Sequence, residues 1–210
     1  MTQRLLLLGA TGLVGSHALR QALDDPRVAR VIAPTRRALP AHPKLENPVV
    51  DFDALPGDAP WWAVDGVICA LGTTIRQAGS KAAFRRVDVD YVIDTAKRAR
   101  AAGARAYALN SAANANAASR IFYLRCKGEA EEAVQALGYA SVAIVRPSLI
   151  GGERTPPRPS ERRTARIMDA LGGLIPARYR VVPAERIAAC MLEDVLKASP
   201  GVRFVESEAI

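Results

Sequence analysis

A tyrosine and a lysine stand four residues apart at Tyr123 and Lys127, and a serine, Ser111, precedes the tyrosine by twelve residues. Residues four apart on a helix share one face, so the phenol and the ammonium are predicted to lie together. A nearby ammonium favours the phenolate form of a tyrosine, which can then act as an acid or base toward an alcohol or carbonyl. The serine hydroxyl is predicted to hold the same substrate oxygen and to stabilise its developing charge. The alternative is a helix tyrosine beside a solvated lysine.

Three glycines, Gly9, Gly12 and Gly15, follow a short apolar run near the N-terminus. An apolar strand that leads through glycines into a helix brings backbone N–H groups up to a pyrophosphate. The first glycine permits the tight turn, the second leaves space for the phosphate, and the third lets the helix pack against the strand. An ordinary glycine-rich turn is the alternative reading. The predicted cofactor contacts here are Gly9, Thr11, Gly12, Leu13, Val14 and Gly15.

The residues after the second apolar run contain two arginines, Arg36 and Arg37, and no carboxylate. A protein that binds NAD commonly places an Asp or Glu at this point to accept from the ribose 2′-hydroxyl. A guanidinium instead donates charge-assisted hydrogen bonds to a 2′-phosphate, so the sequence predicts NADP rather than NAD. Surface arginines are the alternative, because arginine pairs recur at 85–86 and 162–163.

Short apolar runs alternate with helical patterns along most of the chain. Strands are predicted at 4–8, 31–33, 48–50, 66–71, 105–109 and 141–145, and helices at 13–24, 80–102 and 121–137. This alternation predicts an α/β fold, a doubly wound parallel sheet of the Rossmann type with helices on both faces and strand order 3-2-1-4-5-6. Ligands bind at the carboxyl edge of such a sheet, where Ser111 follows the fifth strand. Asp51 follows the third strand, either as an acceptor from the adenine amino group or as a loop cap.

The regular pattern ends after Pro147. Residues 151–183 are predicted to form a lid or substrate segment, a small C-terminal lobe within a single domain that spans residues 1–210. A helix at 184–197 and a strand at 202–205 complete the chain. Four arginines of the lid either clamp an anionic substrate or are solvated; they are Arg154, Arg158, Arg162 and Arg163.

The net charge of +8 comes mainly from arginines spread along the whole sequence. Without a basic patch interleaved with aromatic residues or a known nucleic-acid motif, this pattern favours solvated helix faces over a nucleic-acid partner. The N-terminal apolar run is too short for a signal peptide or for the ~20 residues that span a bilayer, which predicts a cytoplasmic protein without a membrane segment. Cys69, Cys126 and Cys190 lack any C-x-x-C spacing, which predicts reduced thiols and no metal site.

The chain resembles the short-chain dehydrogenase/reductase superfamily, in an atypical small branch. More narrowly, it is similar to the Tat-interacting oxidoreductase family and its bacterial relatives described as nucleoside-diphosphate-sugar epimerase-like. The matching segments are GATGLVG at 9–15, CALGTT at 69–74, FRRVDVDYV at 84–92, YLRCKGEAE at 123–131 and VRPSLIGG at 145–152.

This resemblance implies an NAD(P)-binding fold in which Ser111, Tyr123 and Lys127 match the superfamily's catalytic serine, tyrosine and lysine. Lys127 would also hold the nicotinamide ribose. The resemblance assigns further cofactor contacts to Ala70, Leu71, Gly72, Thr73, Pro147 and Leu149. The chain departs from the family pattern in two places. Asp88 stands where many relatives have an asparagine that supports a proton-relay water, and Ala112 replaces a second serine.

The sequence therefore predicts an NADP-dependent oxidoreductase acting on a small-molecule carbonyl or alcohol, with hydride passing to or from the nicotinamide. One alternative is a sugar-nucleotide epimerase or dehydratase, which would use the same three residues but needs a larger substrate domain. The other is an NADP(H)-binding regulatory or interaction protein with little turnover, a reading that rests on Asp88 and Ala112. The sequence leaves the substrate, the direction of reaction and the oligomeric state open.

Overall fold

The structure is a computed structural model that describes residues 2–152, 176, 178 and 180–210. Most of the predicted lid at 151–183, including its four arginines, lies outside these described residues.

Seven strands form one parallel sheet in the order β3-β2-β1-β4-β5-β6-β9. Their bounds are β1 Gln3–Leu8, β2 Val28–Ile32, β3 Leu45–Glu46, β4 Gly66–Cys69, β5 Ala106–Asn110, β6 Ser141–Arg146 and β9 Gly201–Glu206. The predicted Rossmann-type sheet and its strand order are confirmed, and β9 adds a seventh position beside β6. The strand order reverses between β1 and β4, and the crevice at the carboxyl ends of these strands is the usual ligand position in such sheets.

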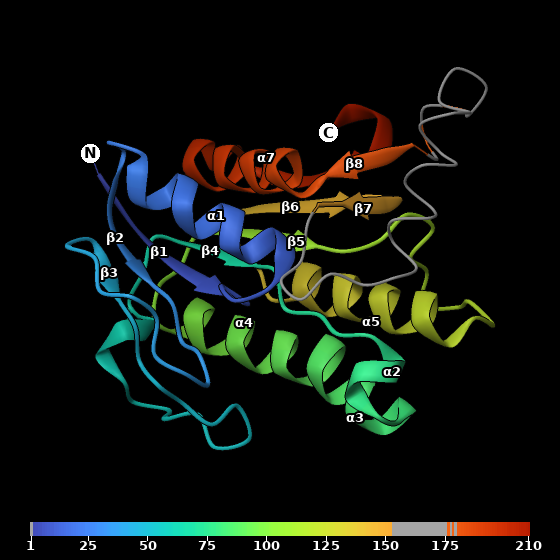
Figure 1. The fold of residues 1–210 in the computed structure, drawn as a ribbon, viewed down its shortest axis with the longest axis horizontal. Coiled ribbons are helices and arrows are strands. Elements are labelled where there is room, and N and C mark those ends of the chain that lie inside the picture. Colours follow the sequence, from blue (N-terminus) through green and yellow to red (C-terminus); the bar gives the residue numbers. More distant parts are fainter. Residues whose placement is uncertain (1, 153–175, 177, 179) are drawn as a thin grey trace.

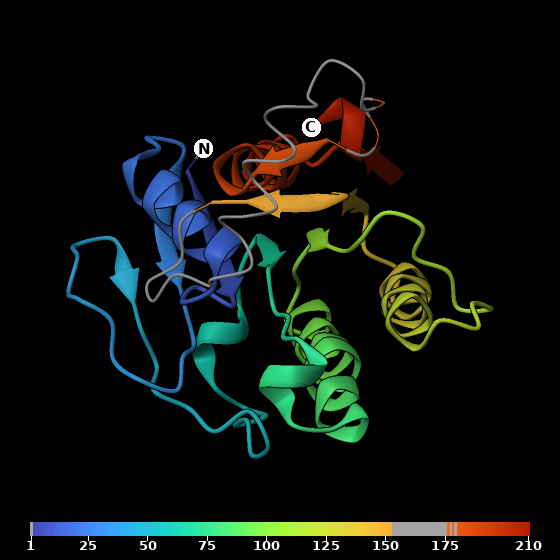
Figure 2. The same ribbon diagram turned by 45° about the vertical axis from the view of Figure 1, so that its right-hand side comes forward.

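Helices cover both faces of the sheet (Figures 1 and 2). The long helices are α1 Leu13–Asp24, α4 Tyr91–Ala101, α5 Phe122–Ala136 and α7 Ala184–Lys197. The α1 and α7 helices pack on one face, and α4 and α5 on the other. The apolar run of β1 serves both faces: Leu5 and Leu7 are buried toward α1 and α7, while Leu6 and Leu8 are buried toward α4 and α5. A continuous leucine run therefore forms a strand here because both of its faces are covered.

The remaining elements are short. They are the 3-10 turns Pro60–Trp62 and Ser207–Ala209, the helices α2 Ile75–Ala78 and α3 Lys81–Arg85, a π-helical turn Arg86–Asp90, and a separate parallel pair of strands, β7 Leu149–Gly151 and β8 Val181–Pro183. The predicted helix at 80–102 is thus divided by the π-helical turn, a feature that often marks functional sites. Ser80 caps α3 by accepting a hydrogen bond from the backbone N–H of Ala83.

The third strand differs from the prediction at 48–50. The regular pairing with β2 is at Leu45–Glu46, and Val49 forms only an isolated bridge with Thr35. Pro48 has no backbone N–H to donate, so regular strand pairing does not extend through this segment.

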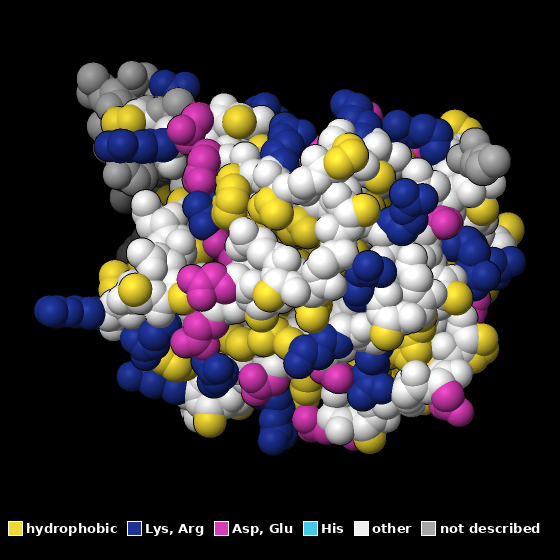
Figure 3. Space-filling model, turned by 180° about the vertical axis from the view of Figure 1, so that it is seen from behind, with side chains coloured by type: hydrophobic (Ala, Val, Ile, Leu, Met, Phe, Trp, Pro, Cys, Tyr) yellow, Lys and Arg dark blue, Asp and Glu magenta, His cyan; other side chains and the backbone are white. Residues whose placement is uncertain are grey.

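None of the described helices is long and apolar enough to cross a membrane. On the face seen in Figure 3, lysine and arginine side chains are spread among acidic and apolar ones rather than gathered in one patch.

Candidate cofactor and active site

The glycines of the first turn are required for different reasons. Gly9 has a φ of +82°, and a Cβ there would lie 2.5 Å from the carbonyl oxygen of Ala70. A Cβ at Gly15 would overlap the carbonyl oxygen of Gly9. A Cβ at Gly12 would meet only that same oxygen closely, at 3.2 Å, and otherwise faces the open groove. Gly9 and Gly15 are therefore needed by the fold, whereas Gly12 keeps space free beside the turn.

The N-terminus of α1 offers unpaired donors at this groove. Gly12 is its N-cap, no side chain caps it, and no acidic residue lies in its first turn. The first N–H groups of a helix have no partner within the helix and carry a partial positive charge. The N–H of Gly12 donates to the carbonyl oxygen of Gly9, but Leu13 and Val14 also line the groove, so the first N–H groups of α1 are available to an anion.

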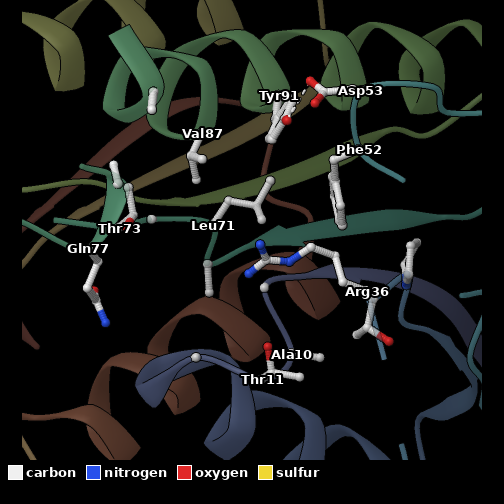
Figure 4. Close-up of a pocket in the computed structure, with 18 of the residues that line it drawn as sticks. Ala10, Thr11, Arg36, Phe52, Asp53, Leu71, Thr73, Gln77, Val87 and Tyr91 are labelled. Atoms are coloured by element: carbon white, nitrogen blue, oxygen red, sulfur yellow. Dashed lines mark hydrogen bonds between the residues drawn. The ribbon is translucent and has the colours of Figure 1, made fainter. Parts of the chain in front are cut away.

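A first cavity of about 570 Å³ lies at the carboxyl ends of β1, β2 and β4 (Figure 4). Arg36 projects into it, and the rings of Phe52 and Tyr91, with centroids 5.5 Å apart, form one wall. The hydroxyl of Tyr91 donates to Asp53 over 2.7 Å. Burial, aided by this bond to Asp53, raises the pKa of Tyr91 to about 12, so the phenol keeps its proton. The cavity thus combines aromatic surface with one projecting guanidinium.

The two predicted arginines are placed differently. Arg36 lines the first cavity and Arg37 is not among its lining residues. The hydroxyl of Thr35 donates to the carbonyl oxygen of Arg37 over 2.6 Å, which fixes the backbone at this point. Asp51 does line the cavity, and its carboxylate also accepts the backbone N–H of Asp53 over 2.9 Å. Both interpretations of Asp51, an adenine contact and a loop cap, are compatible with this position.

A second cavity of about 350 Å³ brings Ser111, Tyr123 and Lys127 together, with Asn110 and Ile150 beside them. It shares part of its lining with the first cavity, so the two form one continuous groove along the sheet edge. The shared residues are Gly12, Ala70, Leu71, Gly72, Thr73 and Gln77. Four of the predicted contacts line neither cavity: Gly15, Arg37, Pro147 and Leu149.

Lys127 is buried and paired. Its Nζ lies 2.8 Å from Oδ1 of Asp88, and the two side chains are only 8% and 1% exposed. The other carboxylate oxygen of Asp88 accepts the backbone N–H of Thr73 over 2.9 Å. Burial alone would lower the pKa of Lys127, but attraction to Asp88 and then to Tyr123 outweighs it, so this pKa is raised. The lysine is therefore a charged group at neutral pH.

The hydroxyl of Ser111 is hydrogen-bonded to Glu131, which does not line the cavity. This hydroxyl lies 2.5 Å from Oε1 of Glu131, whose two oxygens also accept from Arg146 over 3.0 and 2.5 Å. Arg146 also pairs with Glu206 on β9, at 3.1 Å. An ionised carboxylate only accepts hydrogen bonds, so Ser111 must donate its proton to Glu131. The serine consequently presents lone pairs, rather than a proton, to the cavity.

Sequence reasoning missed several lining residues. Asn110 directly precedes Ser111 at the end of β5, so its position was open to inference; its Oδ1 is buried and has no hydrogen-bond partner among the described residues. Phe52, Tyr91 and Gln77 come from a loop and two helices, and no spacing in the sequence marks them.

Comparison with known proteins gives a consistent match. The NAD dependent epimerase/dehydratase family matches residues 5–174. Protein fmp52, mitochondrial, of Aspergillus fumigatus is 35% identical over 93% of this chain and 88% of its own length. Protein HTATIP2 of Rattus norvegicus is 32% identical over 97% of this chain and 86% of its own length. The prediction of a cytoplasmic protein is wrong, because several of the named relatives are mitochondrial proteins.

Solved structures share the fold. MoeE5 in complex with UDP-glucose and NAD superposes with a TM-score of 0.74 at 18% identity, covering 96% of this chain and 74% of MoeE5. A short chain dehydrogenase family protein from Francisella tularensis superposes with a TM-score of 0.67 at 14% identity, covering 100% of this chain and 99% of that protein.

Proposed function

Since the chain belongs to the NAD dependent epimerase/dehydratase family, we propose that it is an NADP-dependent oxidoreductase that acts on a carbonyl or alcohol in the second cavity. Its membership of this family of NAD(P)-dependent enzymes agrees with the expectation of an oxidoreductase-type enzyme. The proposal adds the choice of NADP, the residues that act and the type of substrate.

The residues of the groove fit a nicotinamide dinucleotide. The missing side chain of Gly12 and the free N–H groups of α1 suit a pyrophosphate. The aromatic wall of Phe52 and Tyr91 suits a flat base, and the second cavity would receive the nicotinamide. Lys127 would hold the ribose hydroxyls. When bound, the cofactor would supply or accept the hydride.

The position of Arg36 is the observation that favours NADP over NAD. Its guanidinium projects into the first cavity, where a ribose 2′-phosphate would lie, and β2 is not followed by a carboxylate. Asp53 lines the same cavity, but Tyr91 and Arg86 already engage its carboxylate. Asp51 also lines this cavity and accepts the backbone N–H of Asp53. Among the described residues Arg36 pairs with neither carboxylate, so its guanidinium favours the additional phosphate.

Tyr123 is the proposed acid–base group. Its side chain is 38% exposed at the second cavity, one helical turn before the charged Lys127. In reduction, the phenol would give its proton to the substrate oxygen as the carbonyl carbon receives hydride. In oxidation, the phenolate would take the proton from the alcohol. With its own proton donated to Glu131, Ser111 would orient the substrate by accepting from a hydroxyl or N–H group other than the reacting oxygen, because a carbonyl oxygen has no proton to donate.

A sugar-nucleotide epimerase or dehydratase remains the second candidate, because a structural neighbour was solved with UDP-glucose and NAD. The superposition covers 74% of that neighbour. The two candidates differ in cofactor balance. An oxidoreductase consumes NADPH in step with a carbonyl substrate, whereas an epimerase regenerates its cofactor in each turnover.

The test is isothermal titration calorimetry of NADPH and NADH with the parent protein, Arg36→Ala and the matched control Arg37→Ala. A lost hydrogen bond to a charged group is worth about 1.5–3 kcal/mol. Arg36→Ala should therefore weaken NADPH binding about tenfold or more and leave NADH binding nearly unchanged, while Arg37→Ala changes neither. Preference of the parent protein for NADH would overturn the NADP assignment. Tight NADPH binding without turnover on a carbonyl panel would instead support a binding or regulatory protein.

A further inference from the structure

Asp88 joins two walls of the second cavity. The π-helical turn Arg86–Asp90 places its carboxylate between Thr73, on the segment after β4, and Lys127 on α5. Oδ2 accepts the N–H of Thr73. Oδ1 lies 2.8 Å from the ammonium, and the two side chains form a buried ion pair of opposite charges.

The positive charge of Lys127 is balanced by the groups that face it. From the π-helical turn comes Asp88, from α5 comes the Tyr123 phenol, and from β4 comes the Cys69 thiol. Burial raises the pKa of the Cys69 thiol, which keeps it uncharged at neutral pH. The ammonium of Lys127 thus has one formal counter-charge among these groups, and that counter-charge is Asp88.

This balance matters because the two redox forms of a nicotinamide differ in charge. The oxidised ring carries a positive charge and the reduced ring carries none. A buried, uncompensated ammonium would repel the oxidised ring, and the repulsion would be strong because a partly enclosed site screens charge poorly. We propose that Asp88 sets the relative affinity for oxidised and reduced cofactor by cancelling the charge of Lys127. The inference rests on the proposed placement of the nicotinamide in this cavity.

A purely structural role of Asp88 makes a different prediction. If the carboxylate only held Thr73 and Lys127 in place, its loss would weaken both redox forms to the same extent. The ratio of the two dissociation constants therefore separates an electrostatic role from a structural one. It also requires no knowledge of the substrate.

The experiment measures Kd for NADP⁺ and NADPH by calorimetry in the parent protein, Asp88→Asn, Lys127→Met and the double variant. Asparagine keeps the size of the side chain and an acceptor for Thr73. Asp88→Asn should weaken NADP⁺ about tenfold more than NADPH. Lys127→Met leaves the carboxylate uncompensated and should move the ratio in the opposite direction. The double variant, in which neither charge remains, should return the ratio to that of the parent.

The outcomes distinguish this inference from the proposed function. If the parent binds both forms and Asp88→Asn weakens both equally, Asp88 has only a structural role and the inference is overturned. If Asp88→Asn does not fold, as circular dichroism would reveal, an unchanged ratio in Lys127→Met overturns it equally. If the parent binds neither form, the proposed function itself fails, and the inference falls with it.

Discussion

The hydroxyl of Ser111 donates to Glu131, which is in turn held by Arg146, so in the proposed mechanism Tyr123 rather than Ser111 gives the proton to the substrate. For Ser111 to stabilise a developing oxyanion, its hydroxyl would have to break the hydrogen bond to Glu131 and turn toward the substrate. The two residues should therefore contribute unequally to catalysis, although their positions in the sequence suggest a joint role.

Substitution of each residue tests this division. Tyr123→Phe keeps the ring but removes the phenol, so kcat should fall by about 10²–10⁴. An oxyanion donor is worth about 10²–10³, but Ser111→Ala should cost only about tenfold because the proton is already engaged. The measurement is NADPH consumption with a panel of carbonyl compounds, with NADPH affinity as the control for an intact site.

A drop of a hundredfold or more in Ser111→Ala, with NADPH affinity unchanged, would show that the hydroxyl turns toward the substrate. Unchanged turnover in Tyr123→Phe would place the acid–base chemistry on another group.

At the level of secondary-structure elements, the glycines of the turn before α1 have different roles: Gly15 is required by backbone packing, whereas Gly12 leaves room for a ligand. Gly15→Ala introduces a Cβ that overlaps the backbone of Gly9 and should lower the free energy of unfolding by about 1–3 kcal/mol. Gly12→Ala has more room on the protein side and should cost about 1 kcal/mol through its position as N-cap.

The affinity for NADPH should follow the opposite order, because the methyl group of Gly12→Ala enters the groove where the pyrophosphate would lie. Thermal unfolding measures the loss of stability in both variants, and calorimetry measures their affinity for NADPH. Undiminished NADPH binding in Gly12→Ala would contradict the placement of the phosphates at this turn.

The sequence predicted α1 and α7 with their observed bounds, because each has a clear apolar stripe and a clear end. It did not predict the division of the helix at 80–102, since both segments follow a helical pattern and only the tertiary contacts of Asp88 with Thr73 and Lys127 distinguish the π-helical turn. Contacts between elements also displaced the third strand from its predicted position. The β-branched Val49 and Val50 indicate a strand, but Pro48 and the position of β2 decide where pairing occurs.

At the scale of the whole molecule, the sheet could be predicted because its strands are apolar runs separated by helices of ordinary length. The grouping of Ser111, Tyr123 and Lys127 at one cavity could also be predicted, since they occupy a strand end and one helix face; their catalytic roles stay a prediction. The aromatic wall of the first cavity could not, because Phe52 and Tyr91 meet only after the sheet is assembled. The Glu131–Arg146 pair depends in the same way on contacts between distant elements.

A crystal structure of the protein with NADP⁺ would show whether the whole dinucleotide follows one groove. We expect the pyrophosphate at the N-terminus of α1, the 2′-phosphate beside Arg36 and the nicotinamide ring beside Tyr123 and Lys127. Electron density that placed the nicotinamide away from Tyr123, or the 2′-phosphate away from Arg36, would contradict this expectation.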